Sequence, residues 1–215
     1  MTFDAHKHHR RSIRLKGYDY SQVGAYFVTI SVRGRQCLFG DVVEGTMQLN
    51  DAGRMVWDIW EALPARFADL ELDTFMVMPN HLHGILVLSS HGAPTRGAPT
   101  EGQIASHVRA PLVGAPCDNR APTAGQNTSP RGTATLGEVV GAFKSLITVA
   151  YIRGVKQHDW QPFSGQLLLR NYHEHIIREE AELDRIREYI CNNPMQWHLD
   201  GENPQADRAE RRGGE

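Results

Sequence analysis

Two histidines one residue apart stand at the start of an apolar run, MPNHLHGILVL (residues 78–88). Side chains of a strand alternate between its two faces, so we expect His81 and His83 to share a face and Leu82 to point into the opposite layer. Two imidazoles side by side can bind a metal ion. A hydrogen-bonded pair of histidines at a strand end explains the same spacing, so the motif alone leaves both interpretations open.

Two tyrosines are candidate nucleophiles. In YICNN, Tyr189 and Asn193 are four residues apart and share one face of an expected helix, where the amide oxygen can serve as a third metal ligand. By itself, a half-buried aromatic followed by a helix C-cap is the simpler explanation. The segment NYHEHIIR offers Tyr172 as the alternative nucleophile beside a second pair, His173 and His175, although a strand or loop leading into a helix explains it too.

These residue types suit phosphodiester chemistry. The reaction needs a nucleophile, a cation against the charge that builds on the phosphate oxygens, and an aligned leaving oxygen. A metal on two imidazoles and one amide keeps positions open for phosphate oxygens. Tyrosine, with an ordinary pKa of about 10, is a weak nucleophile until its proton is removed.

Composition narrows the class of protein. A chain of 215 residues is long enough for one well-buried domain. It has no apolar run of the roughly 20 residues that a membrane helix needs and no apolar centre of a signal peptide, so we expect a cytoplasmic protein. Cys37, Cys117 and Cys191 form no CxxC pair, which argues against a disulfide framework or a cysteine zinc site.

A basic arm, residues 1–16, precedes the expected domain. The formal net charge of −2 does not by itself indicate binding to nucleic acid. Residues 7–16, however, contain no acidic residue. Such an arm can contact phosphates, and a solvated tail is equally consistent with it. Its cationic side chains are Lys7, Arg10, Arg11, Arg14 and Lys16.

The helices and strands that must position these residues can be predicted from hydrophobic periodicity and capping residues. Their order predicts an α+β fold, in which helices pack on an antiparallel sheet in the ferredoxin-like or RRM-like style. Gly154 is expected just after the second helix, and Pro194 is expected to stop the third. The expected strands are residues 25–32, 42–49 with a break at Gly45, 71–78, 81–88 and a short one at 166–169; the expected helices are 51–66, 136–154 and 179–193.

Residues 89–135 interrupt this domain, which we place at residues 17–199. The interruption repeats a Gly-Ala-Pro triplet and has almost no aliphatic periodicity, so we expect a disordered insertion. The last residues, 200–215, form a polar tail that we expect to be frayed.

The motifs together resemble the REP-associated tyrosine transposases of the single-tyrosine HUH superfamily. The segments that carry the resemblance are MPNHLHGILVL, RRSIRLKGYDYSQVGAYFVTI, LGEVVGAFKSL, NYHEHIIR and REYICNNPMQW. It covers roughly residues 10–197 without the insertion. It implies the HUH endonuclease fold and a transposase that cleaves and rejoins single-stranded DNA at hairpin-forming repeats.

The resemblance also implies roles for individual residues. Tyr189 would form a 5′-phosphotyrosine and release a 3′-hydroxyl, and Mg²⁺ or Mn²⁺ would be held by His81, His83 and Asn193. Asn193 stands where related transposases often have glutamine. Imidazole ligands favour Mn²⁺ on softness grounds. We expect hairpin DNA as partner, no membrane, and a monomer or homodimer.

The chain departs from this pattern at three positions. Leu168 and Leu169 replace a Trp-Gln pair, and His173 replaces a tyrosine, which puts local DNA contacts in question. A non-catalytic module that binds hairpin DNA or RNA therefore stays as the alternative function. A zinc hydrolase is disfavoured, because no aspartate or further histidine follows closely in HLHGILVLSS.

Overall fold

The computed structural model describes residue 19 and residues 22–89 and 134–206. The basic arm, residues 90–133 of the expected insertion, Cys117 and the end of the tail lie outside the described residues. Cys37 and Cys191 are free thiols. None of the described helices has the length and apolarity that crossing a membrane requires.

A four-stranded antiparallel sheet forms the centre of the domain, in the order β4-β5-β1-β6. Along the chain, the four strands of this sheet and the first two helices follow one another as β1-α1-β4-β5-α2-β6, so two split βαβ units interlock as in ferredoxin-like folds. The predicted α+β architecture is therefore confirmed. The strands are β1 (Gly24–Ser31), β4 (Leu70–Val77), β5 (His81–Leu88) and β6 (His173–Ile177); the helices are α1 (Asp51–Glu61), α2 (Leu136–Gln157) and α3 (Glu180–Asn192).

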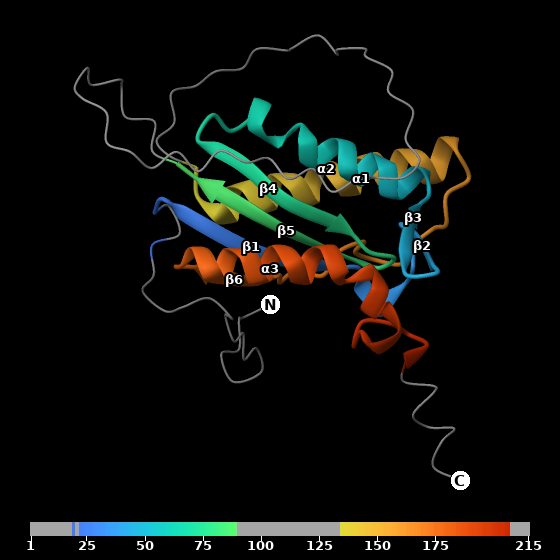
Figure 1. Cartoon of the computed structure of the whole chain (residues 1–215). Helices are drawn as coiled ribbons and strands as arrows, with labels where there is room; N and C mark the ends of the chain where they lie inside the picture. Colours follow the sequence, from blue (N-terminus) through green and yellow to red (C-terminus); the bar gives the residue numbers. More distant parts are fainter. Residues whose placement is uncertain (1–18, 20–21, 90–133, 207–215) are drawn as a thin grey trace, which may run out of the picture.

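Helices cover both faces of the sheet: α1 and α2 pack together on one face, and α3 crosses the other (Figure 1). On the α1/α2 face, Leu82 of β5 joins the larger core cluster, and Trp60 of α1 lies against the strand at Gly84. A Cβ atom at Gly84 would lie 2.4 Å from the Trp60 ring, so only glycine permits this close approach. The histidines on either side of Leu82 consequently face α3.

Helix α3 is attached to its face by a small apolar cluster and one ion pair. Ile190 of α3 packs on Ile85 and Ile177 of the sheet. Arg187 donates two hydrogen bonds to the carboxylate of Asp73, at 3.0 and 2.5 Å. Asp73 lies at a β-bulge, where the pairing of β4 with β5 shifts between Leu72 and Phe75. The bulge thus gives the sheet a carboxylate that fixes the position of α3.

The expected second strand is a hairpin. Strands β2 (Gly40–Val43) and β3 (Thr46–Leu49) pair antiparallel, and the turn between them, Glu44 and Gly45, has φ values of 50° and 73°. Two successive positive φ angles are typical of the type I′ turn, whose twist matches that of the flanking strands. Gly45 therefore joins two strands rather than weakening one.

Several predicted boundaries are wrong. Residues 166–169 form no strand; only Leu168 makes an isolated bridge, to Val32, and the edge strand is β6 instead. Helix α2 continues past Gly154, whose missing Cβ leaves room for the Trp160 ring. Helix α1 ends at Glu61 rather than at residue 66, because a separate 3₁₀ turn, Leu63–Ala65, follows with its proline.

The chain after α3 is more ordered than expected. Pro194 begins a 3₁₀ helix, Pro194–Leu199, and after it Asp200 and Glu202 lie against His81 and Asn80. Asn203 is buried, and its amide donates to the carbonyl of Trp197 at 2.9 Å. The expectation of a frayed tail therefore fails for residues 200–206. Another 3₁₀ turn, Arg33–Arg35, follows β1.

Candidate active site

The two histidines of β5 lie side by side on the α3 face of the sheet. His81 and His83 are 1% and 4% exposed, and their Nε2 atoms are 3.0 Å apart. Leu82 between them is buried in the opposite layer, as the alternation of the strand predicts. Both interpretations of the pair, hydrogen-bonded partners or metal ligands, require the two rings to meet at these atoms.

Asn80 holds the first ring from behind. Its amide nitrogen donates to the backbone carbonyls of Arg35 (3.1 Å) and Glu202 (2.7 Å), which turns the amide oxygen toward His81. That oxygen lies 3.0 Å from His81 Nδ1, so Nδ1 carries the hydrogen and Nε2 keeps its lone pair. A ligand histidine needs this tautomer and this kind of support.

Thr29 holds the second ring in the same way. Its hydroxyl lies 2.9 Å from His83 Nδ1, across the β1–β5 pairing. A hydroxyl can donate or accept, so it suits His83 whichever ring nitrogen carries the proton. Sequence reasoning missed both Thr29 and Asn80; the position of Asn80 directly before the first histidine was the available signal.

Tyr189 projects from α3 over the histidine pair. Its ring centroid lies 5.4 Å from that of His83 and 6.1 Å from that of Phe27, edge-on in both cases. Phe27 in turn stacks on the His83 ring at 5.6 Å. Tyr189 is 44% exposed, so the phenol borders the histidine pair and remains open to a substrate.

Asn193 completes the group at the end of the same helix. Its side chain is close enough to His81 and Tyr189 to shift the pKa of both. Asn193 is 3% exposed, yet its Oδ1 accepts no hydrogen bond within the described part of the chain. A buried amide oxygen without a donor is costly, and a cation is one partner that would satisfy it.

These three side chains fit a divalent cation. Adjacent corners of an octahedron with arms of about 2.1 Å are about 3.0 Å apart, the spacing of the two Nε2 atoms. The described residues contain no group of three His, Cys, Asp or Glu side chains that could hold a metal, and the buried, unsatisfied Oδ1 of Asn193 is a candidate third donor. Two imidazoles and one amide leave further positions for water or phosphate oxygens.

Burial keeps both rings neutral. It lowers the pKa of His81, against the nearby Asp200 carboxylate and Asn193, which raise it. Burial and the neighbouring His81 and His173 lower the pKa of His83 to about 3. A metal-binding imidazole must be unprotonated, so this environment favours the ligand form at neutral pH.

The same environment keeps the phenol protonated. Burial and the negative charge of Asp200 raise the pKa of Tyr189, and the nearby Asn193 amide offsets this only in part. A reaction at Tyr189 therefore needs a group or an ion that helps to remove its proton.

A hollow of about 290 Å³ opens beside these groups. Two of its lining residues, Asp200 and Glu202, belong to the segment expected to be frayed, which is why sequence reasoning missed them. Asp200 Oδ2 lies 3.6 Å from His81 Nε2. The lining consists of Phe27, Thr29, His81, His83, His173, Tyr189, Asp200 and Glu202.

The other sequence candidates lie elsewhere. Tyr172, the alternative nucleophile, packs against the larger core cluster and does not line the hollow. The five cations of the basic arm are outside the described residues.

The fold is that of a known class of DNA transposase. The solved structure of a REP-associated tyrosine transposase bound to a REP hairpin matches with a TM-score of 0.51 and 15% sequence identity. The match covers 94% of this chain and 87% of that one, so the chain has the fold of the REP-associated tyrosine transposases.

One curated relative is close in sequence. An uncharacterized protein of Haemophilus influenzae (strain ATCC 51907 / DSM 11121 / KW20 / Rd) is 38% identical over 200 residues. The aligned region is 92% of this chain and 95% of the Haemophilus protein, so this chain belongs to the family of that protein. No family model matches the chain.

Proposed function

We propose that the protein is a metal-dependent endonuclease and strand transferase for single-stranded DNA. One observation carries the proposal: the Tyr189 phenol and the His81–His83 pair line one open hollow, and the buried, unsatisfied Asn193 side chain lies close to His81 and Tyr189. A nucleophile next to a set of cation ligands is what phosphodiester transfer needs.

In the cleavage step, the Tyr189 phenol is the nucleophile. Tyr189 Oη forms a bond to phosphorus while the bond from phosphorus to the 3′ oxygen breaks. The phenolic proton leaves Tyr189 and the 3′ oxygen takes up a proton, so the products are a 5′-phosphotyrosine and a free 3′-hydroxyl. Attack of a 3′-hydroxyl on the phosphotyrosine reverses the step and rejoins DNA.

The remaining side chains bind and orient. His81, His83 and Asn193 would hold Mg²⁺ or Mn²⁺, and the bound ion would oppose the negative charge that develops on the phosphate oxygens. Asn80 and Thr29 fix the two rings. Phe27 stacks on His83 and lies edge-on to Tyr189, so it holds the phenol and imidazole rings in their relative positions.

We propose hairpin-forming repeats as the substrate class. The solved transposase with this fold was bound to a REP hairpin, and carrying that ligand to this chain is part of the proposal. Lys7, Arg10, Arg11, Arg14 and Lys16 would contact its phosphates. Deleting residues 1–16 should weaken binding across sequences and reduce its salt dependence; unchanged binding would remove the arm from the proposal.

A covalent adduct is the decisive test. Single-stranded hairpin DNA incubated with the protein and Mn²⁺ should give a protein–DNA adduct that survives denaturation. Tyr189→Phe should abolish it and Tyr172→Phe should retain it. An adduct that persists in Tyr189→Phe but disappears in Tyr172→Phe would move the nucleophile to Tyr172.

One observation favours the alternative, a non-catalytic hairpin-binding module. Asp200 and Glu202 bring negative charge to the hollow where a phosphate must enter. Under the alternative, hairpin DNA binds but no adduct forms with Mn²⁺ or Mg²⁺, even in Asp200→Asn. An adduct in the unaltered protein excludes it.

A further inference from the structure

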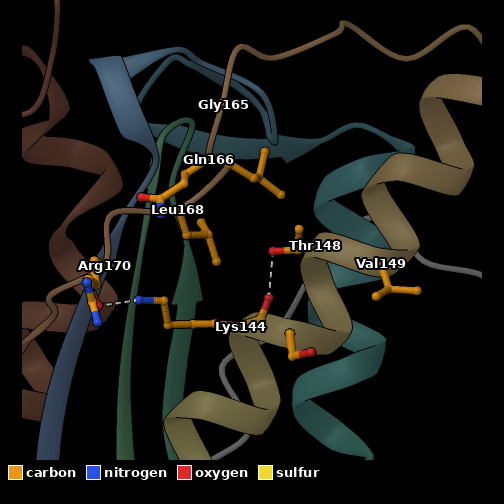
Figure 2. Close-up of a pocket in the computed structure, with 9 residues that line it drawn as sticks. Lys144, Thr148, Val149, Gly165, Gln166, Leu168 and Arg170 are labelled. Carbon is orange, nitrogen blue, oxygen red and sulfur yellow. Dashed lines mark hydrogen bonds between the residues drawn. The ribbon is translucent and has the colours of Figure 1, made fainter. Parts of the chain in front are cut away.

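A second hollow lies between α2 and the segment that precedes β6. It has a volume of about 400 Å³ and shares no lining residue with the hollow at Tyr189. Figure 2 shows Lys144 reaching from α2 to the backbone of this segment at Arg170. The lining consists of Lys144, Ser145, Thr148, Val149, Gly165, Gln166, Leu167, Leu168 and Arg170.

The hollow is positively charged. Its lining includes two cations, Lys144 and Arg170, and no Asp or Glu. Lys144 donates to the carbonyls of Leu169 and Arg170, at 2.5 and 2.8 Å, which leaves one of its three N–H groups for another acceptor. Burial lowers the pKa of Lys144, so a bound anion would compensate for the water that the ammonium has lost.

Arg170 is an available anion ligand. Arg170 is an exposed residue, and its guanidinium forms no ion pair with any residue that the structure describes. The fixed fork of guanidinium donors matches the geometry of a phosphate. Together, Arg170 and the spare Lys144 proton can bind one phosphate group.

The rest of the lining suits a nucleotide base in addition to a phosphate. The apolar lining comes from Val149, which is exposed, and from Leu168, which is only 5% exposed, and Gln166 supplies an amide that can donate and accept. A phosphate of duplex DNA needs only a surface cation, whereas a base outside a helix needs an apolar surface and polar groups for its edge. The volume of about 400 Å³ lies within the range of small-ligand sites.

The two hollows are linked by a short stretch of chain. Arg170 lines the second hollow and His173 lines the first, and three residues of chain span at most about 11 Å. A DNA strand that lies along this edge of the sheet can therefore enter both sites within a few nucleotides.

We propose that this second hollow binds one unpaired nucleotide of single-stranded DNA, with its phosphate at Arg170 and Lys144 and its base against Leu168 and Val149. The choice of DNA rests on the proposed function. The site itself rests on its own lining residues.

Fluorescence anisotropy of the full-length protein in EDTA tests the site without cleavage. The probes are a labelled oligothymidine and a labelled blunt hairpin. Arg170→Ala should weaken oligothymidine binding about 5- to 10-fold and reduce the slope of log affinity against log salt by about 0.7, the value for one lost phosphate contact with a single strand. Gln166→Ala should weaken binding about threefold without changing the slope.

The matched control is Arg153→Ala, which removes an exposed arginine from α2 outside the hollow. It should stay within about twofold of the unaltered protein. The inference fails if Arg170→Ala behaves like Arg153→Ala, if blunt hairpin binding falls equally, or if oligothymidine does not bind at all.

These results are independent of the adduct assay. Weaker oligothymidine binding in Arg170→Ala supports the nucleotide site even if no adduct forms. A normal adduct together with unaltered binding in Arg170→Ala overturns the nucleotide site and leaves the proposed function in place.

Discussion

Asn80 and His81 are neighbours in sequence whose side chains also face each other: the amide oxygen of Asn80 lies 3.0 Å from His81 Nδ1. Two backbone carbonyls, of Arg35 and Glu202, hold the amide nitrogen on the opposite side. The direction in which the Nε2 lone pair of His81 points is thus set by segments far apart in the chain.

Asn80→Ala should therefore weaken metal binding. Loss of the partner behind a ligand histidine typically costs 10- to 100-fold in affinity, and we expect a loss in about that range. Titration with Mn²⁺ followed by electron paramagnetic resonance measures the free ion directly and needs no DNA. Unchanged Mn²⁺ affinity in a folded Asn80→Ala protein would contradict the supporting role of Asn80 behind a metal-binding His81.

Thr29 permits a finer comparison. Thr29→Ser keeps the hydroxyl beside His83 Nδ1 and Thr29→Val removes it at similar volume. Mn²⁺ affinity should stay within about threefold in Thr29→Ser and fall about tenfold in Thr29→Val. Equal affinities in the two variants would contradict a role for the hydroxyl.

Asn193→Ala should weaken metal binding while leaving the stability of the fold almost unchanged. Because Oδ1 accepts no hydrogen bond from the described residues, removing it should change the free energy of unfolding by no more than about 1 kcal/mol. Mn²⁺ affinity should nevertheless fall at least about tenfold, since one ligand is lost. Urea denaturation in EDTA and Mn²⁺ titration measure the two effects; a large stability loss with intact affinity would make Asn193 a structural residue.

The Arg187–Asp73 pair should make the attachment of α3 sensitive to acid. Burial alone would raise the pKa of Asp73, but the hydrogen bonds from Arg187 and Thr74 bring it below its usual value. A depressed pKa in the folded state means that the carboxylate stabilises the fold above about pH 4 and that this contribution is lost as the pH falls further.

Asp73→Asn should show this dependence. At pH 7 it should lower the free energy of unfolding by about 1 to 3 kcal/mol, and the difference from the unaltered protein should shrink below about pH 4. Denaturant titrations at a series of pH values measure it, with Asp184→Asn, the exposed partner of Arg187, as control. A difference that does not depend on pH would contradict the charge-based explanation.

Gly84→Ala should destabilise the layer beneath the histidines. The added methyl group would collide with Trp60, and such overpacking costs about 1 to 3 kcal/mol. Gly141→Ala is the control, because nothing lies within 4 Å of that position on α2 and alanine favours a helix by about 1 kcal/mol. Thermal denaturation should shift the midpoints of the two variants in opposite directions.

Local patterns in the sequence predicted the parts of the site that lie within one element. Alternation along β5 placed both histidines on one face, and the four-residue spacing on α3 put Tyr189 and Asn193 together. Nothing local predicted Thr29, whose partner is 54 residues away. Asp200 and Glu202 lie in polar sequence, and their contacts with Asn80 and His81, distant in the chain, are not predictable from that sequence.

The errors in the fold have the same origin. Residues 166–169 carry the apolar pattern of a strand, but β6 is the segment that pairs along β1, and tertiary pairing decides which segment forms the edge. A glycine at position 154 is typical of a helix end in sequence. In the structure its missing Cβ makes room for the Trp160 ring, and local sequence patterns do not predict this tertiary contact.

The direction of β5 gives the molecule a convenient attachment point. His81 begins the strand and Leu88 ends it, so Ser89, where the chain continues into the Gly-Ala-Pro sequence, is about 25 Å from His81. A fluorophore, a tether or a shortened linker introduced after Ser89 would lie far from the candidate active site. This position is therefore suited to attaching labels for engineering or single-molecule work.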